Sequence, residues 1–219
     1  MQLSPFWESY LNKKEHPVDF TIENNVLLKV ETLATRVVVP EGVTAIGPKA
    51  FQSCFRLKGI RLPDTVESLG EHAFNWCRDL TEVHIPEKAL EGYSLMGAMS
   101  LFDDTFFNHP GMAYRFVAQM LDGVADYSAG FRKLCLSDLT DPFFRGQWVS
   151  RCIREDKPQW LAQILQLNDR LPLEELEQHI EFCVQTQAPK YTAILLEYKN
   201  THYSPEEIAA AMADVLGEP

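Results

Sequence analysis

The sequence lacks any cluster of basic residues, and basic residues are scarce overall. It contains 20 Lys and Arg against 31 Asp and Glu, for a formal net charge of -11. Affinity for phosphates depends on clustered Lys and Arg, so no nucleic-acid partner is expected. Residues 99–219 carry 10 basic and 18 acidic residues, most of the excess. We interpret this acidic half as a solvated helix surface; an acidic docking surface for a basic partner is the alternative.

Motifs that bind metals or phosphates, or that activate a serine, are also missing. The six histidines never occur as H-E-x-x-H or H-x-H, and neither G-x-S-x-G nor G-x-x-x-x-G-K-[ST] is present. Asp103, Asp104 and His109 are neighbours in sequence, but chance places such a trio in many loops. Cys135 lies between apolar neighbours and is interpreted as a packed thiol rather than a nucleophile. We therefore predict no catalytic residue, no metal site and no cofactor.

Long hydrophobic runs and export signals are absent too. Residues 93–107 are largely uncharged, but they are too few to span a bilayer and they contain glycine. The N-terminus, MQLSPFWESY, has no basic segment leading into an apolar one. The five cysteines are an odd number, and with 46% hydrophobic residues the chain needs no disulfide framework. We expect a cytoplasmic protein.

A repeat of 23 residues is the main feature that the sequence does contain. Pro40, Pro63 and Pro86 mark its period. The matching pairs are Val43 and Val66, Gly47 and Gly70, Ala50 and Ala73, Phe51 and Phe74, Cys54 and Cys77, and Leu57 and Leu80. A fixed period in the low twenties predicts a solenoid, in which each coil buries its apolar side chains against its neighbours.

Each coil should contain one short strand. Residues 37–39, 60–62 and 83–85 favour β-structure and stop at a proline, which cannot donate a hydrogen bond to a neighbouring strand. The first and last residue of each run should point inward. Cys54 and Cys77 should lie in adjacent coils, where we favour a ladder of free thiols over a disulfide.

The middle residues of these strands define a candidate partner-binding site. Val38, Arg61 and His84 should form one outward column, flanked on the same face by Arg36 and Glu82. Arg61 would be its anchor, because arginine offers a planar fork of donors and is enriched at interface hot spots. The alternatives are an ordinary solvated sheet face and a wall packed on the helical domain.

Two stretches resemble the bacterial BspA-like leucine-rich repeats: VVVPEGVTAIGPKAFQSCFRLKGI and RLPDTVESLGEHAFNWCRDLTEV. They share that family's order of strand, Pro, Val, apolar-Gly, Ala-Phe, Cys and Leu. The preceding FTIENNVLLKV resembles the β-hairpin that opens such domains, so the resemblance covers residues 18–88. It implies a curved repeat array that binds proteins, as surface or adhesive proteins of the family do.

From these strands we expect a short right-handed solenoid with parallel stacked strands, opened by a hairpin over residues 20–30. Phe51 and Phe74 should stack in its core. After Pro86 the register decays, because Gly97 stands where the repeat requires phenylalanine. We interpret residues 93–107 as a cap over the open solenoid end, with an exposed docking patch as the alternative.

From about Gly111 onward the apolar residues follow helical spacing. A second repeat superposes residues 157–180 on residues 188–212 at an offset of about 31. Its matching pairs are Trp160 and Tyr191, Ala162 and Ala193, and Leu165 and Leu196. Such helix pairs resemble ankyrin-type hairpins, although the TPLH signature is absent. An unrelated small bundle is the alternative.

Together these patterns predict an α+β chain. Residues 1–92 form a short leucine-rich-repeat-type solenoid with an N-terminal hairpin cap, and residues 93–219 form an all-α domain. The expected function is a non-enzymatic protein-protein interaction module for a protein or peptide partner. The alternatives are an enzyme with a site at the cleft between the domains, and an assembly protein whose repeat ends pair with other copies.

Overall fold

The structure is a computed structural model, and it describes residues 16–52, 54–103, 105, 109–167 and 170–216. Contacts divide the chain into two compact units, Met1–Ser137 and Asp138–Pro219. The expected division between residues 92 and 93 falls inside the first unit.

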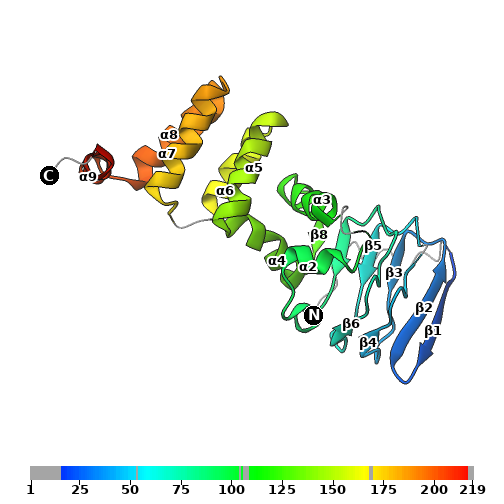
Figure 1. Cartoon of the computed structure of the whole chain (residues 1–219). Helices are drawn as coiled ribbons and strands as arrows, with labels where there is room; N and C mark the ends of the chain where they lie inside the picture. Colours follow the sequence, from blue (N-terminus) through cyan, green and yellow to red (C-terminus); the bar gives the residue numbers. More distant parts are fainter. Residues whose placement is uncertain (1–15, 53, 104, 106–108, 168–169, 217–219) are drawn as a thin grey trace. The chain divides into compact units, whose positions relative to one another are not determined.

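A hairpin opens the first unit, as the sequence predicts (Figure 1). β1 (Val18–Glu23) and β2 (Val26–Thr32) pair antiparallel through a turn at Asn24 and Asn25, both of which have positive φ. Asparagine tolerates that conformation better than most residues. β2 then pairs in parallel with β4 (Ala45–Ile46), and β4 pairs with β6 (Ser68–Leu69). The sequence did not predict this second sheet, whose repeated strands are only two residues long.

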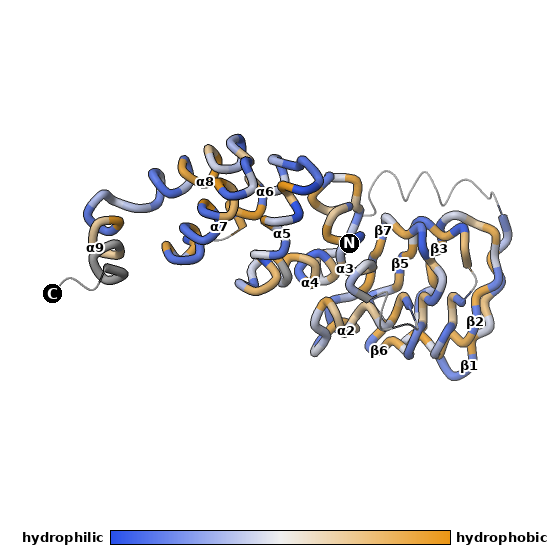
Figure 2. The backbone as a smooth tube through the Cα atoms, turned by 45° about the horizontal axis from the view of Figure 1, so that its top comes forward, coloured by the Kyte–Doolittle hydropathy of each residue, from blue (hydrophilic) through white to orange (hydrophobic). Residues whose placement is uncertain are grey.

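The predicted parallel strands form the other sheet. β3 (Arg36–Val38), β5 (Gly59–Arg61) and β7 (Glu82–His84) pair in register. The six residues expected to point inward are all buried: Val37, Val39, Ile60, Leu62, Val83 and Ile85. Figure 2 shows hydrophobic stretches recurring along these coils. A fourth strand, β8 (Asp126–Tyr127), pairs in parallel with β7.

The third coil departs from the 23-residue register after Pro86, as the sequence predicts, but it still supplies a core phenylalanine, Phe102. Phe51 N donates to Ala73 O at 2.8 Å, and Phe74 N donates to Leu101 O at 2.7 Å. Leu101 and Phe102 therefore occupy the Ala-Phe position, 28 residues after Ala73 and Phe74 instead of 23. η1 (Glu87–Leu90) and α2 (Leu95–Met99) lie within the lengthened coil.

The stacked phenylalanines form the core of the first unit. The Phe74 ring lies 5.3 Å from Phe51 and 5.3 Å from Phe102, measured between ring centroids. Phe102 in turn contacts Phe116 of α3 (His109–Leu121) and Phe131 of α4 (Ala129–Thr140). Residues beyond 92 thus cover the last coil, which explains why the first compact unit continues past the repeats.

Glycine and cysteine at the repeat positions have clear roles. A Cβ on Gly70 would lie 2.4 Å from Pro48 N, so only glycine allows the two coils to approach this closely.

The thiols of Cys54 and Cys77 donate to the backbone carbonyls of Val30 and Phe51 at 3.7 and 3.4 Å. All five cysteines are free and buried, and burial raises the pKa of Cys54 to about 11. These thiols pack as small hydrophobes.

The second unit is built of helix pairs (Figure 1). Its helices are α5 (Pro142–Arg154), α6 (Pro158–Gln166), α7 (Leu173–Gln185), α8 (Pro189–His202) and α9 (Pro205–Leu216). Asp141 caps α5, since its carboxylate accepts hydrogen bonds from Phe143 N and Phe144 N. Ser204 and Glu207 form a capping box at α9.

The 31-residue offset is visible in the geometry of this unit. Asp156 and Gln187, 31 residues apart, both have positive φ, 55° and 52°. Pro158 and Pro189 follow them at the starts of α6 and α8. α5–α6 and α7–α8 are thus two copies of one helix pair. α9 begins 32 residues after α7, where the first helix of a third pair would begin. Along the described stretches of the chain, no helix is long and apolar enough to cross a membrane.

Candidate functional site

The sheet of β3, β5, β7 and β8 brings the five predicted site residues to one face. Its register aligns Arg36 with Glu82 across Gly59, and Val38 with Arg61 and His84. Two short rows therefore lie side by side, because residues two positions apart on a strand share a face. We call these five residues the strand face.

An ion pair fixes one of these rows. Arg36 Nε donates to Glu82 Oε2 at 2.7 Å, and Arg36 Nη2 donates to Glu82 Oε1 at 2.6 Å. The pair spans two strand spacings, and Gly59 between them has no side chain to obstruct it. The two side chains are only 20% and 10% exposed. This bidentate geometry is the stronger form of an arginine-carboxylate contact, so both charges are already satisfied.

The other row is anchored at its end by a residue that the sequence did not indicate. His84 Nε2 lies 3.1 Å from Asp126 Oδ1, in β8. Asp126 follows Glu82 by 44 residues, which is not a multiple of 23, so the repeat register could not predict it. No motif in the sequence marked Asp126 as a neighbour of this face.

Arg61 differs from the other charged members of the strand face. Its side chain forms no hydrogen bond or ion pair with the residues that the structure describes, and it is partly exposed. It lies between Val38 and His84 in the register. The face thus presents one available guanidinium, that of Arg61, beside the paired charges of Arg36 and Glu82.

Comparison with known families agrees with the stacked parallel strands of this sheet. Residues 20–98 match the family described as "BspA type Leucine rich repeat region (6 copies)". This segment is a BspA-type leucine-rich repeat region. The strand face therefore belongs to leucine-rich repeats, which commonly mediate protein-protein interaction.

Matches to individual proteins are few. A solved leucine-rich repeat protein of T. pallidum is similar at 26% identity, over 35% of this chain and 39% of that chain, with a TM-score of 0.29. The chain thus spans well under half the length of that structure. No curated protein matches.

Two of the residues considered as catalytic groups, Asp103 and Cys135, lie outside the leucine-rich repeat region and have contacts or burial typical of structural residues. The carboxylate of Asp103 accepts hydrogen bonds from Thr105 N at 2.7 Å and Thr105 Oγ1 at 2.6 Å. Asp104 and the side chain of His109 lie outside the described residues. Cys135 is fully buried. Among the described residues, no group of three or more His, Cys, Asp or Glu side chains could hold a metal ion.

Proposed function

We propose that this chain is a non-enzymatic interaction module whose strand face binds a protein or peptide. The observation that carries the proposal is Arg61, a partly exposed arginine in a sheet where the neighbouring Arg36 and Glu82 already form an ion pair. Because Arg36 and Glu82 are already held by their ion pair, a docking partner does not have to order those two side chains. A carboxylate is the group that best fits the guanidinium. The proposed partner is a segment with an acidic side chain over Arg61.

The test requires a captured partner and a dissociation constant. Arg61→Ala with His84→Ala should weaken binding by at least about tenfold, as expected for truncation of an interface arginine. Arg132→Ala is a matched control, because Arg132 is exposed on α4 in the same unit. It should bind as the wild type does.

A folded double variant that binds within about twofold of the wild type would remove the strand face from consideration, since a hot-spot truncation costs far more. Attention would then pass to the acidic helical half. Melting curves of all three proteins establish that any loss of binding is not a loss of fold.

We also infer that the protein works in a reducing compartment, the cytoplasm. Support comes from Cys54 and Cys77, whose thiols donate to carbonyls of the preceding coil. Alkylation of freshly isolated protein in denaturant, without added reductant, should modify all five cysteines. A Cys54–Cys77 disulfide found by mass spectrometry in that sample would contradict this assignment.

A further inference from the structure

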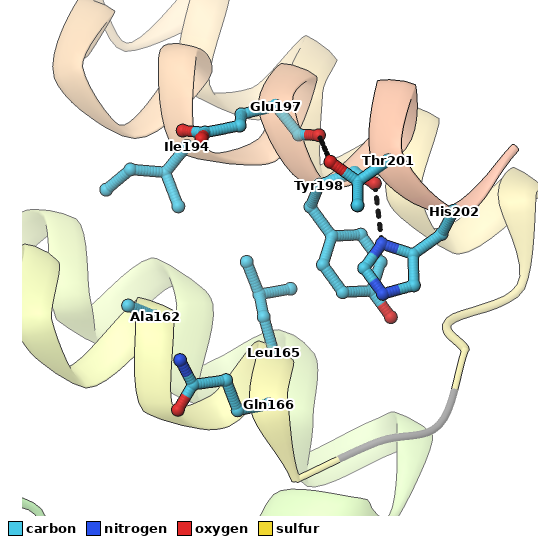
Figure 3. A pocket seen from close by; sticks show the side chains of 8 residues that line it. All are labelled: Ala162, Leu165, Gln166, Ile194, Glu197, Tyr198, Thr201 and His202. Carbon is cyan, nitrogen blue, oxygen red and sulfur yellow. Dashed lines mark hydrogen bonds between the residues drawn. The ribbon is translucent and has the colours of Figure 1, made fainter.

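The second unit contains a groove between α6 and α8 (Figure 3). The groove has a volume of about 500 Å³. Ala162 and Leu165 line it from α6, and Ile194 and Tyr198 line it from α8. Leu165 and Tyr198 are buried, whereas Ala162 and Ile194 are only half-buried. We call this feature the α6–α8 groove; it offers apolar surface and room for a side chain from outside.

The polar atoms beside the last turns of α8 can accept hydrogen bonds from a ligand in this groove. Glu197 contributes a carboxylate, which has no ion pair or hydrogen bond with any residue that the structure describes. Thr201 Oγ1 donates to Glu197 O at 2.8 Å, and its oxygen can still accept. His202 Nδ1 lies 2.8 Å from Tyr198 O, so Nδ1 carries the proton and Nε2 of the neutral ring is an acceptor.

No basic side chain in the lining balances the Glu197 carboxylate. None of the described residues that line the α6–α8 groove is Lys or Arg. The second unit as a whole carries twice as many acidic as basic residues. A cation with hydrogen-bond donors, an ammonium or a guanidinium, therefore complements this end of the groove, and a carboxylate would be repelled.

We propose that the α6–α8 groove binds a basic amphipathic segment of another protein. An apolar side chain of that segment enters between Ala162, Leu165 and Ile194, and a lysine or arginine pairs with Glu197. Glu197 follows Ile194 by three residues, about 4.5 Å along the helix axis, so the two side chains of the partner are about one helical turn apart. The site lies within the second unit and does not depend on the strand face.

The apolar and charged parts of the groove have different roles. An exposed ion pair contributes little affinity by itself, because water and salt screen it. Burial of an apolar side chain supplies affinity but does not distinguish basic from acidic partners. Affinity therefore comes from the contact with Ala162, Leu165 and Ile194, and the choice of a basic partner comes from Glu197.

Titration calorimetry on the full chain with two synthetic peptides tests the preference for a basic segment. One peptide repeats Leu-Lys-Lys-Leu, which places leucine and lysine one helical turn apart. The other has glutamate at every lysine position. The lysine peptide should bind at least about tenfold more tightly, and its affinity should fall as the salt concentration rises.

Charge reversal tests the role of Glu197. Glu197→Lys should weaken binding of the lysine peptide by at least about tenfold, because it replaces attraction with repulsion. Glu174→Lys is the matched control, since Glu174 is exposed on α7, lies outside the groove and changes the net charge equally. It should lower the affinity far less.

Filling the groove tests its location. Ala162→Phe should weaken binding by at least about tenfold, because the larger side chain occupies the space that the partner needs. Ala193→Phe is the matched control, since Ala193 is the equivalent residue 31 positions later and lines a different hollow. It should bind as the wild type does. Melting curves establish that each variant is folded.

Four outcomes would overturn the proposal. The glutamate peptide may bind as tightly as the lysine peptide, or the lysine peptide may not bind at all. Glu197→Lys may lose no more affinity than Glu174→Lys, or binding may be lost in Ala193→Phe and kept in Ala162→Phe. If Ala162→Phe does not fold, the comparison of Glu197→Lys with Glu174→Lys decides alone.

Discussion

Replacing Phe74 with alanine should unfold the leucine-rich repeat region or leave it close to unfolding. Phe74 is fully buried, and its ring is stacked between Phe51 and Phe102. Truncating a buried phenylalanine costs about 3 to 5 kcal/mol, from lost transfer energy and the cavity left behind. That cost is a large share of the stability of a typical domain. Thermal and denaturant melts should show a lost or strongly shifted transition.

Phe55→Ala is the matched control, because Phe55 lies in the same repeats but is 59% exposed. Surface substitutions of this kind usually change stability by less than about 0.5 kcal/mol. A Phe74→Ala protein that melts as the Phe55→Ala protein does would contradict the phenylalanine stack as the source of stability.

The stack also shows where a repeat period stops being informative. Strict spacing identified Phe51 and Phe74, and it then pointed to Gly97 instead of Phe102. Five extra residues in the third coil shift the register, and the pattern of the earlier coils does not anticipate an insertion. The core position persists because Phe102 still meets Phe74 in space.

The candidate site was also predictable only in part, because only its local geometry follows from the sequence. Alternation along a strand depends on local geometry, so the common face of Val38, Arg61 and His84 followed from the sequence. Gly59 leaves room for Arg36 to contact Glu82 two strands away, and this depends on the lengths of those side chains rather than on the repeat. The Asp126 contact depends on a chain return after α3. Neither is encoded in the spacing of the repeats.

In the helical half, the offset of 31 rested on few matched residues, among them Trp160 and Tyr191. Both residues are buried near the start of the second helix of a pair. The sequence repeat is therefore detectable here because the same packing position needs a large aromatic side chain in both copies. The starts of α6 and α7 are 15 residues apart and those of α8 and α9 are 16 apart, so the offset shifts by one residue and the sequence alone shows it less clearly.

Replacing Arg145 with methionine should strongly destabilise the second unit. Arg145 is 3% exposed and donates to both carboxylate oxygens of Glu175 at 2.6 Å, and to Thr140 O at 3.0 Å. Removing one partner of a buried pair costs about 3 to 5 kcal/mol, because the other charge stays buried without compensation. Arg151→Met in the same helix removes a partly exposed contact to Glu155, at 3.8 Å, and should cost less than about 1 kcal/mol.

The loss should depend on pH in a defined direction. Burial alone would raise the pKa of Glu175, but hydrogen bonds and charge from Arg145 outweigh it, so the pKa lies below its usual value. A depressed carboxyl pKa stabilises the fold above the unfolded-state pKa, and that stabilisation disappears as pH falls through the folded-state pKa. The difference between wild type and Arg145→Met should therefore be largest near neutral pH and shrink in acid. Denaturant melts at several pH values measure it, and a difference that grows in acid would contradict this account.

Neutralising the Glu175 carboxylate, which Arg145→Met leaves buried without its partner, should recover much of the lost stability. In the Arg145→Met background, Glu175→Gln leaves an uncharged side chain that His179, 3.3 Å from Glu175 Oε1, can still contact. The two changes should therefore be far from additive, with the double variant more stable than the sum of the single variants predicts. Strict additivity in denaturant melts would mean that Arg145 acts through its bond to Thr140 rather than through Glu175. Non-additivity would identify this ion pair as the contact that holds α5 against α7, on which the packing of the helix pairs depends.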